Sequence, residues 1–417
     1  MHVRHLLVGV VALGVSSEAP ASTLDLFGFG MRSPALAGTG VATANDYEAV
    51  YANPAGLAEA TEKRATVGAV IADFRTKMNG DIVGEASSGM VLGGVVPMPL
   101  GGWAKDRIAL GLGFYVPNEA LNRVRAPFPG VPQFALLENR TYVIAVQLGV
   151  GVKLSDKLSV GAGAIILAAL RGGIDVTTDA NANFSADSEQ RLIAQFSPVL
   201  GARYRASSKL TYGLTFRAPV RSDYDILVTS DLGDALPLEL PVIRIAGTAQ
   251  YDPLTIAAEA AWRPREDLLL TGQVAYQRWS AYPLPTKNPV PGTPAQQPPG
   301  FEDRPVPRLG VEWTRRAGQA TLATRAGYAF LWSPAPQMKG QQSLLDNHRH
   351  MLAAGFGVAL EGKVPVRLDV FGQWHRLVHR NHTKDPDMQQ PGEDPAFDKI
   401  ATSGNVLVVG AALGLDL

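Results

Sequence analysis

Apolar residues alternate with small or polar residues, segment after segment, from about residue 64 to the end of the chain. In the last segment one set of alternate positions is Leu407, Val409, Ala411, Leu413, Leu415 and Leu417, and the other is Val408, Gly410, Ala412, Gly414 and Asp416. Successive side chains of a β-strand point to opposite faces, so each segment predicts a strand with one apolar face. A long run of such strands forms either a soluble sandwich or a barrel in a membrane.

An export signal precedes the strands. His2, Arg4 and His5 stand before the apolar run 6–15, and Ala19-Pro20-Ala21 offers an A-x-A cleavage site. We therefore predict a signal peptide at residues 1–21, with a buried N-terminal strand as the alternative. No later run of about 18 apolar residues predicts a transmembrane helix. An exported chain of this kind is either secreted or an outer-membrane barrel.

The connections between the strands separate these two folds. The pattern predicts fourteen strands, near 64–74, 87–97, 107–117, 140–154, 157–171, 190–206, 209–219, 254–263, 267–279, 305–315, 319–332, 348–361, 364–378 and 404–417. Tight turns such as 155–157 and 207–208 alternate with long connections such as 118–139, 172–189 and 220–253. Outer-membrane barrels place short turns in the periplasm and long loops outside. We predict an all-β transmembrane antiparallel barrel over residues 64–417; a soluble sandwich is the alternative.

The two faces of the strands agree with a barrel. Along 364–378 the outward set is Val364, Val366, Leu368, Val370 and Trp374, whereas the inward set holds Arg367, Asp369, Gln373 and His375. A charge on the lipid face costs about 2–4 kcal/mol at mid-bilayer, so a barrel keeps its charges inside. We also expect Trp262 and Trp313 to lie in one interfacial girdle, and Trp279, Trp332 and Trp374 in the other.

Residues 22–63 do not alternate and predict a separate small segment. Ser33-Pro34 is expected to be an N-cap followed by proline, Asn45-Asp46 to cap a short helix, and Asn53-Pro54 to repeat the first device. Helices this short do not fold alone. A lumen of about fourteen strands is wide enough to hold such a segment. We predict an N-terminal helical hatch that plugs the barrel.

The hatch segment also carries a family resemblance. The motifs Phe27-Gly28-Phe29-Gly30, Ala37-Gly38-Thr39-Gly40 and Ala49-Val50-Tyr51-Ala52-Asn53-Pro54-Ala55-Gly56-Leu57 resemble the hatch of the FadL-type outer-membrane transporters of long-chain fatty acids and aromatic hydrocarbons. Gly111-x-Gly113-Phe114-Tyr115-Val116-Pro117 resembles the end of the family's third strand. The C-terminal Leu413-x-Leu415-x-Leu417 is a partial match to the signal read by the barrel assembly machinery, because that signal usually ends in an aromatic residue.

The resemblance implies passive uptake of hydrophobic molecules through a hatch-gated pocket, with lateral release into the membrane. It assigns hatch structure or gating to Asn53, Pro54, Ala55 and Gly56. It places the apolar N-terminus (Leu24, Leu26, Phe27 and Phe29) near the pocket, although packing on the barrel wall explains these residues equally well. It implies a kink in the third strand, where Gly111 and Gly113 could provide the lateral opening; glycines facing a crowded lumen are the alternative. The apolar connection 220–253 would be an outer groove for amphiphiles or an extension of the strands.

Composition narrows the other possibilities. The 38 basic and 38 acidic residues balance, which argues against nucleic-acid binding, and the absence of cysteine rules out thiolate chemistry. The five histidines after residue 300 do not converge by parity, so we expect no metal and no cofactor. The partners expected are fatty acids or hydrocarbons, lipid and lipopolysaccharide of a Gram-negative outer membrane, and the assembly machinery, with the chain a monomer. A general porin is the runner-up function. A lipase or protease using His350 and Ser343 and an adhesin are further alternatives; we expect no enzyme.

Overall fold

The computed structural model describes residues 24–118, 132–134, 136–137, 144–178, 184–231, 242–284, 298–337, 344–383 and 399–417. The predicted signal peptide lies outside these ranges. None of the helices described is long and apolar enough to cross a membrane.

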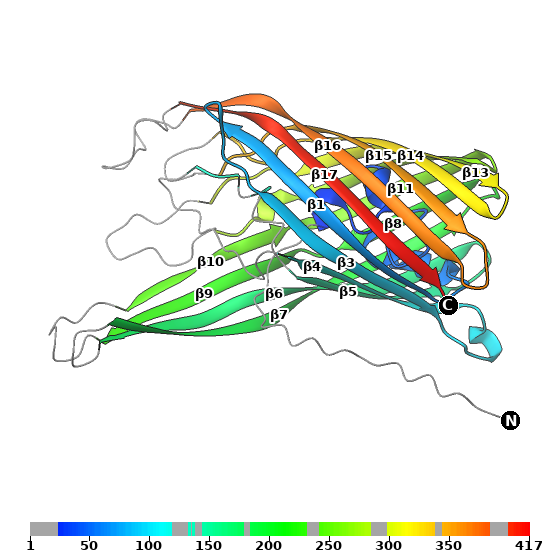
Figure 1. Ribbon diagram of the computed structural model, residues 1–417, viewed down its shortest axis with the longest axis horizontal. Coiled ribbons are helices and arrows are strands. Elements are labelled where there is room, and N and C mark those ends of the chain that lie inside the picture. Colours follow the sequence, from blue (N-terminus) through cyan, green and yellow to red (C-terminus); the bar gives the residue numbers. More distant parts are fainter. Residues whose placement is uncertain are drawn as a thin grey trace.

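Fourteen antiparallel strands form a closed barrel, as the alternation predicted (Figure 1). The barrel closes where the first and last strands pair residue by residue, from Arg64 opposite Asp416 to Met78 opposite Thr402. Closure leaves no open sheet edge in the wall, which a lipid environment requires. The wall strands are β1 (Arg64–Met78), β3 (Ala86–Pro97), β4 (Ile108–Pro117), β5 (Ala145–Lys153), β6 (Leu158–Thr178), β7 (Phe184–Arg205), β8 (Leu210–Arg217), β11 (Leu254–Arg265), β12 (Leu268–Arg278), β13 (Arg304–Ala317), β14 (Ala320–Leu331), β15 (Arg349–Leu360), β16 (Val366–Thr383) and β17 (Lys399–Asp416).

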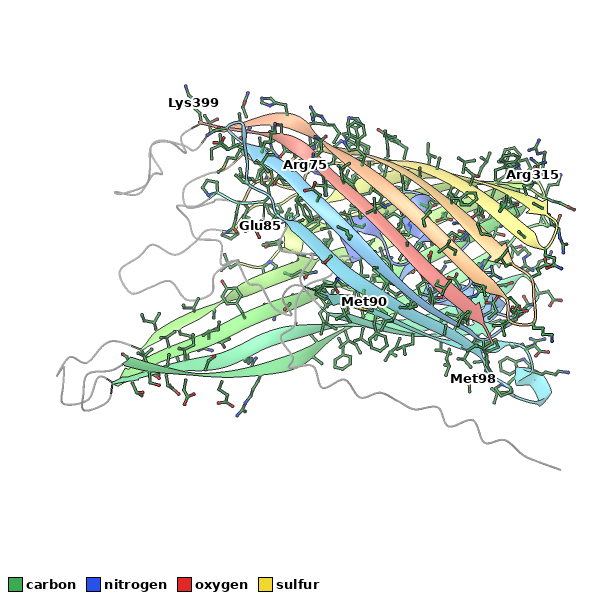
Figure 2. The ribbon with its side chains drawn as sticks, in the orientation of Figure 1. Arg75, Glu85, Met90, Met98, Arg315 and Lys399 are labelled. Atoms are coloured by element: carbon green, nitrogen blue, oxygen red, sulfur yellow. The ribbon has the colours of Figure 1, made fainter. Side chains whose placement is uncertain are left out.

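The tight turns that join β5 to β6, β7 to β8, β11 to β12, β13 to β14 and β15 to β16 lie at the end of the barrel that holds the C-terminus (Figure 1). They include 154–157 between β5 and β6 and 318–319 between β13 and β14; the connection from β3 to β4 contains a 3-10 turn, η2 (Gly102–Ala104). Figure 2 shows Met98 and Arg315 near this end, and Arg75, Glu85 and Lys399 near the opposite end. Both chain ends of the barrel therefore lie on the short-turn side, which corresponds to the periplasm.

The outer surface of the wall is apolar, as expected for contact with lipid. Val67 and Ile71 of β1, Leu309 of β13, and Leu368 and Trp374 of β16 are all exposed. The inward partners on the same strands include the buried Glu312 and His375. The predicted assignment of the two faces is therefore correct for Leu368, Trp374 and His375 of β16.

One girdle residue was predicted wrongly. Trp262, Trp313, Trp332 and Trp374 are exposed, but Trp279 is buried. It lies in the short 3-10 turn η5 (Trp279–Ala281) that follows β12, where the chain leaves the strand and parity no longer holds. There it packs against Tyr251, Tyr282 and Phe301, with ring centroids 6.2, 6.5 and 6.3 Å away.

Two of the long connections are largely strand, which was unexpected for 172–189 and was one of the two alternatives for 220–253. β6 and β7 remain paired beyond the barrel wall, up to Thr178 opposite Phe184. The connection 220–253 contains the hairpin β9 (Val220–Asp231) and β10 (Ile243–Asp252). β9 pairs in parallel with the far part of β6, from Leu170 opposite Tyr224 onward. The four strands form an extension in the order β7–β6–β9–β10, which projects from the barrel in Figure 1. A short strand, β2 (Asp81–Ile82), completes the sheet.

β7 stays paired with one edge of β6 up to Thr178, so β9 lies on the other edge and must cross both β7 and β6 to reach it from β8. Val220 at the start of β9 is buried in the same apolar cluster as Ile165, Leu167 and Val199. These three residues have the inward parity of β6 and β7, so the crossing occurs on the lumen side. The start of β9 therefore narrows the outer mouth of the barrel.

The extension has one apolar face and one charged face. The register places Ile174 and Val176 of β6 beside Val228 of β9 and Ile243 of β10. On the other face Arg244 forms an ion pair with Asp225 at 2.6 Å, and Thr229 hydrogen-bonds Asp175. The apolar residues share the parity of Ile166, which points outward from the wall. The apolar face is therefore continuous with the lipid-facing surface.

Candidate functional site

Residues 24–63 lie inside the barrel, and we call them the hatch. Figure 1 shows their short helices enclosed by the strands. The elements are α1 (Leu24–Phe27), α2 (Arg32–Ala35), α3 (Ala49–Ala52) and the 3-10 helix η1 (Pro54–Glu59). Helices of one turn are unstable alone, so the wall must hold the hatch in place. The predicted cap at Ser33 is wrong: Ser33 lies inside α2, and its hydroxyl donates to the Thr39 carbonyl at 2.5 Å. Glu48 holds the N-cap position of α3, and Asp46 accepts the Glu48 N–H at 3.0 Å in the turn that leads into this helix.

Asn53 fastens the hatch to itself and to the wall. Its side-chain oxygen accepts a hydrogen bond from the Ala55 N–H at 3.1 Å, which makes it the predicted N-cap of η1, with Pro54 at the first helical position. Its amide nitrogen donates to the Val41 carbonyl at 2.7 Å and to the Ala202 carbonyl of β7 at 3.0 Å. The residue is fully buried. One side chain thus links two parts of the hatch and one wall strand.

The inward wall residues beside η1 include glycines, because the hatch backbone occupies the space that a side chain would need. A Cβ atom at Gly161 of β6 would lie 2.3 Å from the Ala55 nitrogen. One at Gly201 of β7 would lie 1.9 Å from the Asn53 side-chain oxygen. Gly56 is constrained in the same way, since its Cβ would lie 2.0 Å from the Ala44 carbonyl oxygen. The small inward residues of the alternating pattern therefore form the surface against which the hatch packs.

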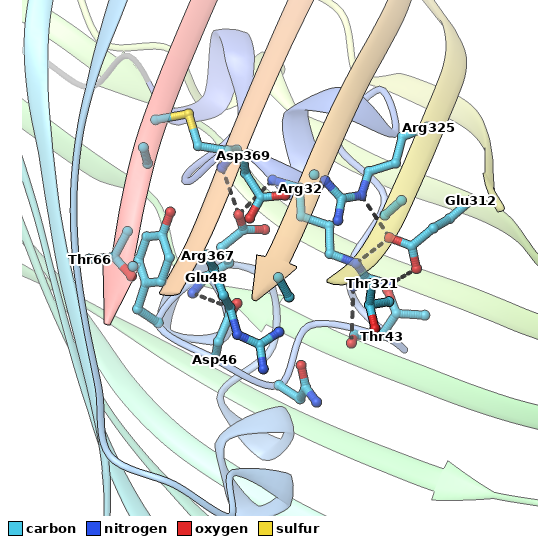
Figure 3. A pocket seen from close by; sticks show the side chains of 18 of the residues that line it. Arg32, Thr43, Asp46, Glu48, Thr66, Glu312, Thr321, Arg325, Arg367 and Asp369 are labelled. Atoms are coloured by element: carbon cyan, nitrogen blue, oxygen red, sulfur yellow. Dashed lines mark hydrogen bonds and ion pairs between the residues drawn. The ribbon is translucent and has the colours of Figure 1, made fainter. Parts of the chain in front are cut away.

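Charged side chains fasten the other side of the hatch (Figure 3). Arg32 of α2 forms two hydrogen bonds to Glu312 of β13, at 2.7 and 2.8 Å, and Arg325 of β14 forms a third at 2.7 Å. Arg325 also pairs with Asp369 of β16 at 2.5 Å. Glu312 is 5% exposed. The carboxylate of Glu312 therefore joins the hatch to the wall within a buried network.

Two more carboxylates hold loop backbone in the hatch. Glu48 accepts from the N–H groups of Met31, Arg32 and Ser33 at 2.6, 2.8 and 2.8 Å. Glu259 of β11 accepts from those of Gly40 and Val41 at 2.6 and 2.8 Å. Burial and the neighbouring Asp46 raise the pKa of Glu48 to about 8, while the N–H donors oppose the rise. These bonds satisfy buried backbone donors that irregular structure leaves without partners.

Neutralising Glu312 tests the buried network. We expect Glu312→Gln to lower the free energy of unfolding by about 3–5 kcal/mol, because it leaves Arg32 and Arg325 buried without their common carboxylate. Urea titration of the refolded protein in detergent micelles, followed by tryptophan fluorescence, measures the change. Glu361→Gln is the control: Glu361 pairs with Arg316, but the two side chains are 58% and 71% exposed. The control should lose less than about 1 kcal/mol. Equal losses in the two variants would contradict the structural role of Glu312.

The predicted pocket residues lie on top of the hatch, toward the outer mouth. Leu24, Leu26, Phe27 and Phe29 are all buried, each 2% exposed. Phe27 stacks edge-on to His375 of β16 at 5.6 Å and lies 6.0 Å from Phe74 of β1, between ring centroids. Phe29 packs against Tyr47 of the hatch, with its ring centroid 5.5 Å away. A role in solute binding stays a prediction for these residues.

Gly111 and Gly113 lie in β4, which pairs residue by residue with β3 and β5 and has no register shift. The pairing shows no bulge between Ile108 and Tyr115, and a lateral opening at these glycines stays a prediction. The glycines face the hatch, since a Cβ at Gly111 would lie 2.5 Å from Val50 and one at Gly113 would lie 2.6 Å from Phe29. Crowding by the hatch explains both residues.

The inner wall differs between the two halves of the barrel. Buried inward residues of β1, β3, β4, β6 and β17 are mostly apolar: Val70, Phe74, Val91, Val95, Tyr115, Ile165, Leu167, Val406 and Val408. The strands β11 to β16, which we call the polar half, combine buried apolar residues such as Val306, Met351 and Phe371 with many buried polar ones: Glu259, Thr271, Gln273, Gln277, Glu312, Arg325, Arg349, Gln373 and His375. The polar half binds hatch backbone; Gln373, for example, donates to the Phe27 carbonyl at 2.9 Å. The apolar half supplies a surface that an apolar molecule could follow.

The sequence also raised a metal site and a hydrolase site, and the histidines among the described residues bear on both. Within the described ranges no group of three or more His, Asp or Glu residues could hold a metal ion. His375 is buried in the lumen, whereas His350 is exposed and hydrogen-bonds the Tyr328 hydroxyl at 2.9 Å. Ser343, the possible partner of His350 in an enzyme, lies outside the described residues.

Comparison with known proteins gives a consistent result. Residues 12–410 match the family model described as outer membrane protein transport protein (OMPP1/FadL/TodX). No curated protein matches the sequence significantly. The fold resembles a Pseudomonas aeruginosa FadL homologue, with 14% identity, 93% of this chain and 97% of that chain covered, and a TM-score of 0.60. It also resembles the P. putida toluene transporter TodX (13% identity, 94% and 99% covered, TM-score 0.54) and the monoaromatic hydrocarbon channel CymD (14% identity, 94% and 98% covered, TM-score 0.54).

Proposed function

The chain belongs to the OMPP1/FadL/TodX family of outer membrane transport proteins, and from this premise we propose that it takes up hydrophobic molecules passively. The solutes proposed are long-chain fatty acids or hydrocarbons. TodX, which has the same fold, is described as a toluene transporter, and CymD as a monoaromatic hydrocarbon channel. No energy source is required, because a solute moves down its own gradient. We propose transport and no enzymatic activity for this barrel.

The observation that carries the proposal is a hatch seated in a lumen with one apolar half. The hatch backbone lies against wall glycines such as Gly161, and the apolar half extends above it through Phe74 and Leu167. Burial of apolar surface is worth about 25 cal/mol per Å², so such a surface competes with lipid for a hydrophobic solute. We propose that the solute follows this half to the residues of α1 and that Asn53 to Gly56 gate its passage past the hatch. We propose that the solute is then released laterally into the membrane.

Native mass spectrometry and uptake together test the proposal. The purified barrel should retain hydrophobic molecules that can be extracted into organic solvent and identified. Cells that carry the protein should accumulate labelled oleate or toluene faster than cells that lack it. An unchanged rate for both solutes, with the protein present in the outer membrane, would leave transport of this class unsupported.

The apolar face of the extension is the proposed surface for initial capture. We expect Val228→Asp to reduce uptake several-fold at low solute concentration, because a carboxylate interrupts the strip formed by Ile174, Val228 and Ile243. Leu227→Asp is the matched control, since Leu227 is exposed on the charged face of the same strand. Initial uptake rates of labelled oleate measure the effect. Equal rates in the two variants would argue against capture on this face.

The environment proposed is a Gram-negative outer membrane with lipopolysaccharide in its outer leaflet. The apolar wall supports contact with lipid, and the extension stands on the long-loop side, where lipopolysaccharide lies. We propose that the barrel works as a monomer and that the assembly machinery inserts it. Crosslinking in intact cells tests the monomer: a single band at about the mass of one chain is expected.

A further inference from the structure

A charged cavity of about 280 Å³ lies between the hatch and the wall (Figure 3). Its lining includes Arg64 at the start of β1 and Gly414 near the end of β17, so it lies on the short-turn side, beneath the hatch. A water molecule occupies about 30 Å³ in the liquid, so the space is large enough for a small hydrated ion. The cavity is remote from α1, and the solute route proposed above does not use it.

More arginines line this cavity than its acidic side chains neutralise. Arg32 and Arg325 bind Glu312, and Arg64 and Arg367 both bind Asp416. Two further arginines, Arg203 of β7 and Arg263 of β11, also line the cavity and form no ion pair with any described residue.

The acidic groups of the cavity are already occupied. Asp369 pairs with Arg325, and Asp46 lies 3.6 Å from Arg64. Glu48 accepts three backbone N–H groups. None of these carboxylates is therefore available to neutralise Arg203 or Arg263, and an added anion meets an excess of positive charge.

Two donors on residues that line the cavity are buried and lack a hydrogen-bond partner among the described residues. They are the Nη1 atom of Arg203 and the hydroxyl of Thr43. Arg203 belongs to the wall and Thr43 to the hatch. Leaving a buried polar group without a partner costs about 1–3 kcal/mol, and more for a charged group. An acceptor between them would satisfy a donor on each side of the hatch interface.

We propose that this cavity binds a small free oxyanion, such as phosphate, which bridges Thr43 of the hatch and Arg203 and Arg263 of the wall. Guanidinium groups bind carboxylate and phosphate oxygens with charge-assisted hydrogen bonds. The lining is mostly charged and hydroxyl-bearing, so an ion without an apolar tail fits it best. Bound there, the anion stabilises the seated hatch, because a ligand that binds only one state raises its stability.

Isothermal titration calorimetry of the detergent-solubilised protein with inorganic phosphate, at fixed ionic strength, tests the site. We expect one saturable site in the unaltered protein and at least tenfold weaker binding in Arg203→Gln. Arg263 is exposed, so Arg263→Gln should fold normally and also weaken binding. Arg316→Gln is the control, because Arg316 lies near the end of β13 and is 71% exposed. This variant should bind phosphate as tightly as the unaltered protein.

Acetate and hexanoate identify the source of the oxyanion. Similar, weak binding of the two carboxylates supports a free ion. Hexanoate binding tenfold more tightly than acetate would overturn that assignment, since it would make the cavity a site for the head group of a solute. No saturable phosphate binding by the unaltered, folded protein, or unchanged binding in both Arg203→Gln and Arg263→Gln, would overturn the proposal altogether.

Discussion

Asn53→Ala is expected to make a closed channel leak polar solutes. The substitution removes the hydrogen bonds to Val41, Ala55 and the Ala202 carbonyl of β7, and it leaves those groups buried. Each buried group left unsatisfied costs about 1–3 kcal/mol. A loss of about 2 kcal/mol raises the population of displaced hatch about thirtyfold. The barrel itself should stay intact, because its strands are joined by their own backbone hydrogen bonds.

Conductance of single proteins in planar bilayers measures the leak. We expect the unaltered protein to be closed and Asn53→Ala to show long open events. Asn405→Ala is the control: Asn405 of β17 accepts from the Trp374 indole N–H at 3.1 Å on the outer surface and does not contact the hatch. A closed Asn53→Ala, folded and inserted like the control, would contradict the fastening role of this residue.

A single added methyl group on the inner wall should have a comparable effect. Gly161→Ala places a Cβ 2.3 Å from the backbone of Ala55, so either η1 or β6 must shift. Overpacking of this kind costs about 1–3 kcal/mol. The strand is held by two neighbours, β5 and β7, whereas η1 is one short helix. We therefore expect the hatch to move and the channel to leak.

Swelling of proteoliposomes in arabinose measures this leak in bulk. Gly272→Ala is the matched control, because Gly272 of β12 has the outward parity and its Cβ would come no closer than 3.8 Å to another atom, Cδ2 of Leu309. The control liposomes should swell as slowly as those with the unaltered protein. Equal swelling with Gly161→Ala and with Gly272→Ala would show that the wall glycines do not seat the hatch.

Much of the barrel was predictable because the alternation of apolar and polar residues is a local pattern. Alternation fixes which face each residue takes, and it placed Leu368 outward and His375 inward correctly. The same rule does not say where a strand leaves the membrane, so the outer parts of β6 and β7 were expected as a loop, and an extension of the strands was only one of two alternatives for 220–253. It also fails where a strand ends, which is why Trp279 was placed in a girdle although it turns inward.

The site was less predictable because its contacts join distant parts of the chain. The cap at Asn53 could be predicted from the Asn-Pro pair, but its bond to Ala202 spans 149 residues. Glu312 and Glu259 bind Arg32 and the Gly40 N–H of the hatch, and these partners follow only from the tertiary fold. Gly111 and Gly113 were expected either to kink a strand or to face a crowded lumen, and the structure places the side chains of Val50 and Phe29 beside them.

The central claim is that the barrel admits hydrophobic solutes while its hatch excludes polar ones. Proteoliposomes containing the unaltered protein test it directly, through entry of labelled oleate and of arabinose in the same preparation. We predict that oleate enters several-fold faster than in protein-free liposomes and that arabinose does not. Rapid arabinose entry without any gain for oleate would contradict the claim and identify a general porin.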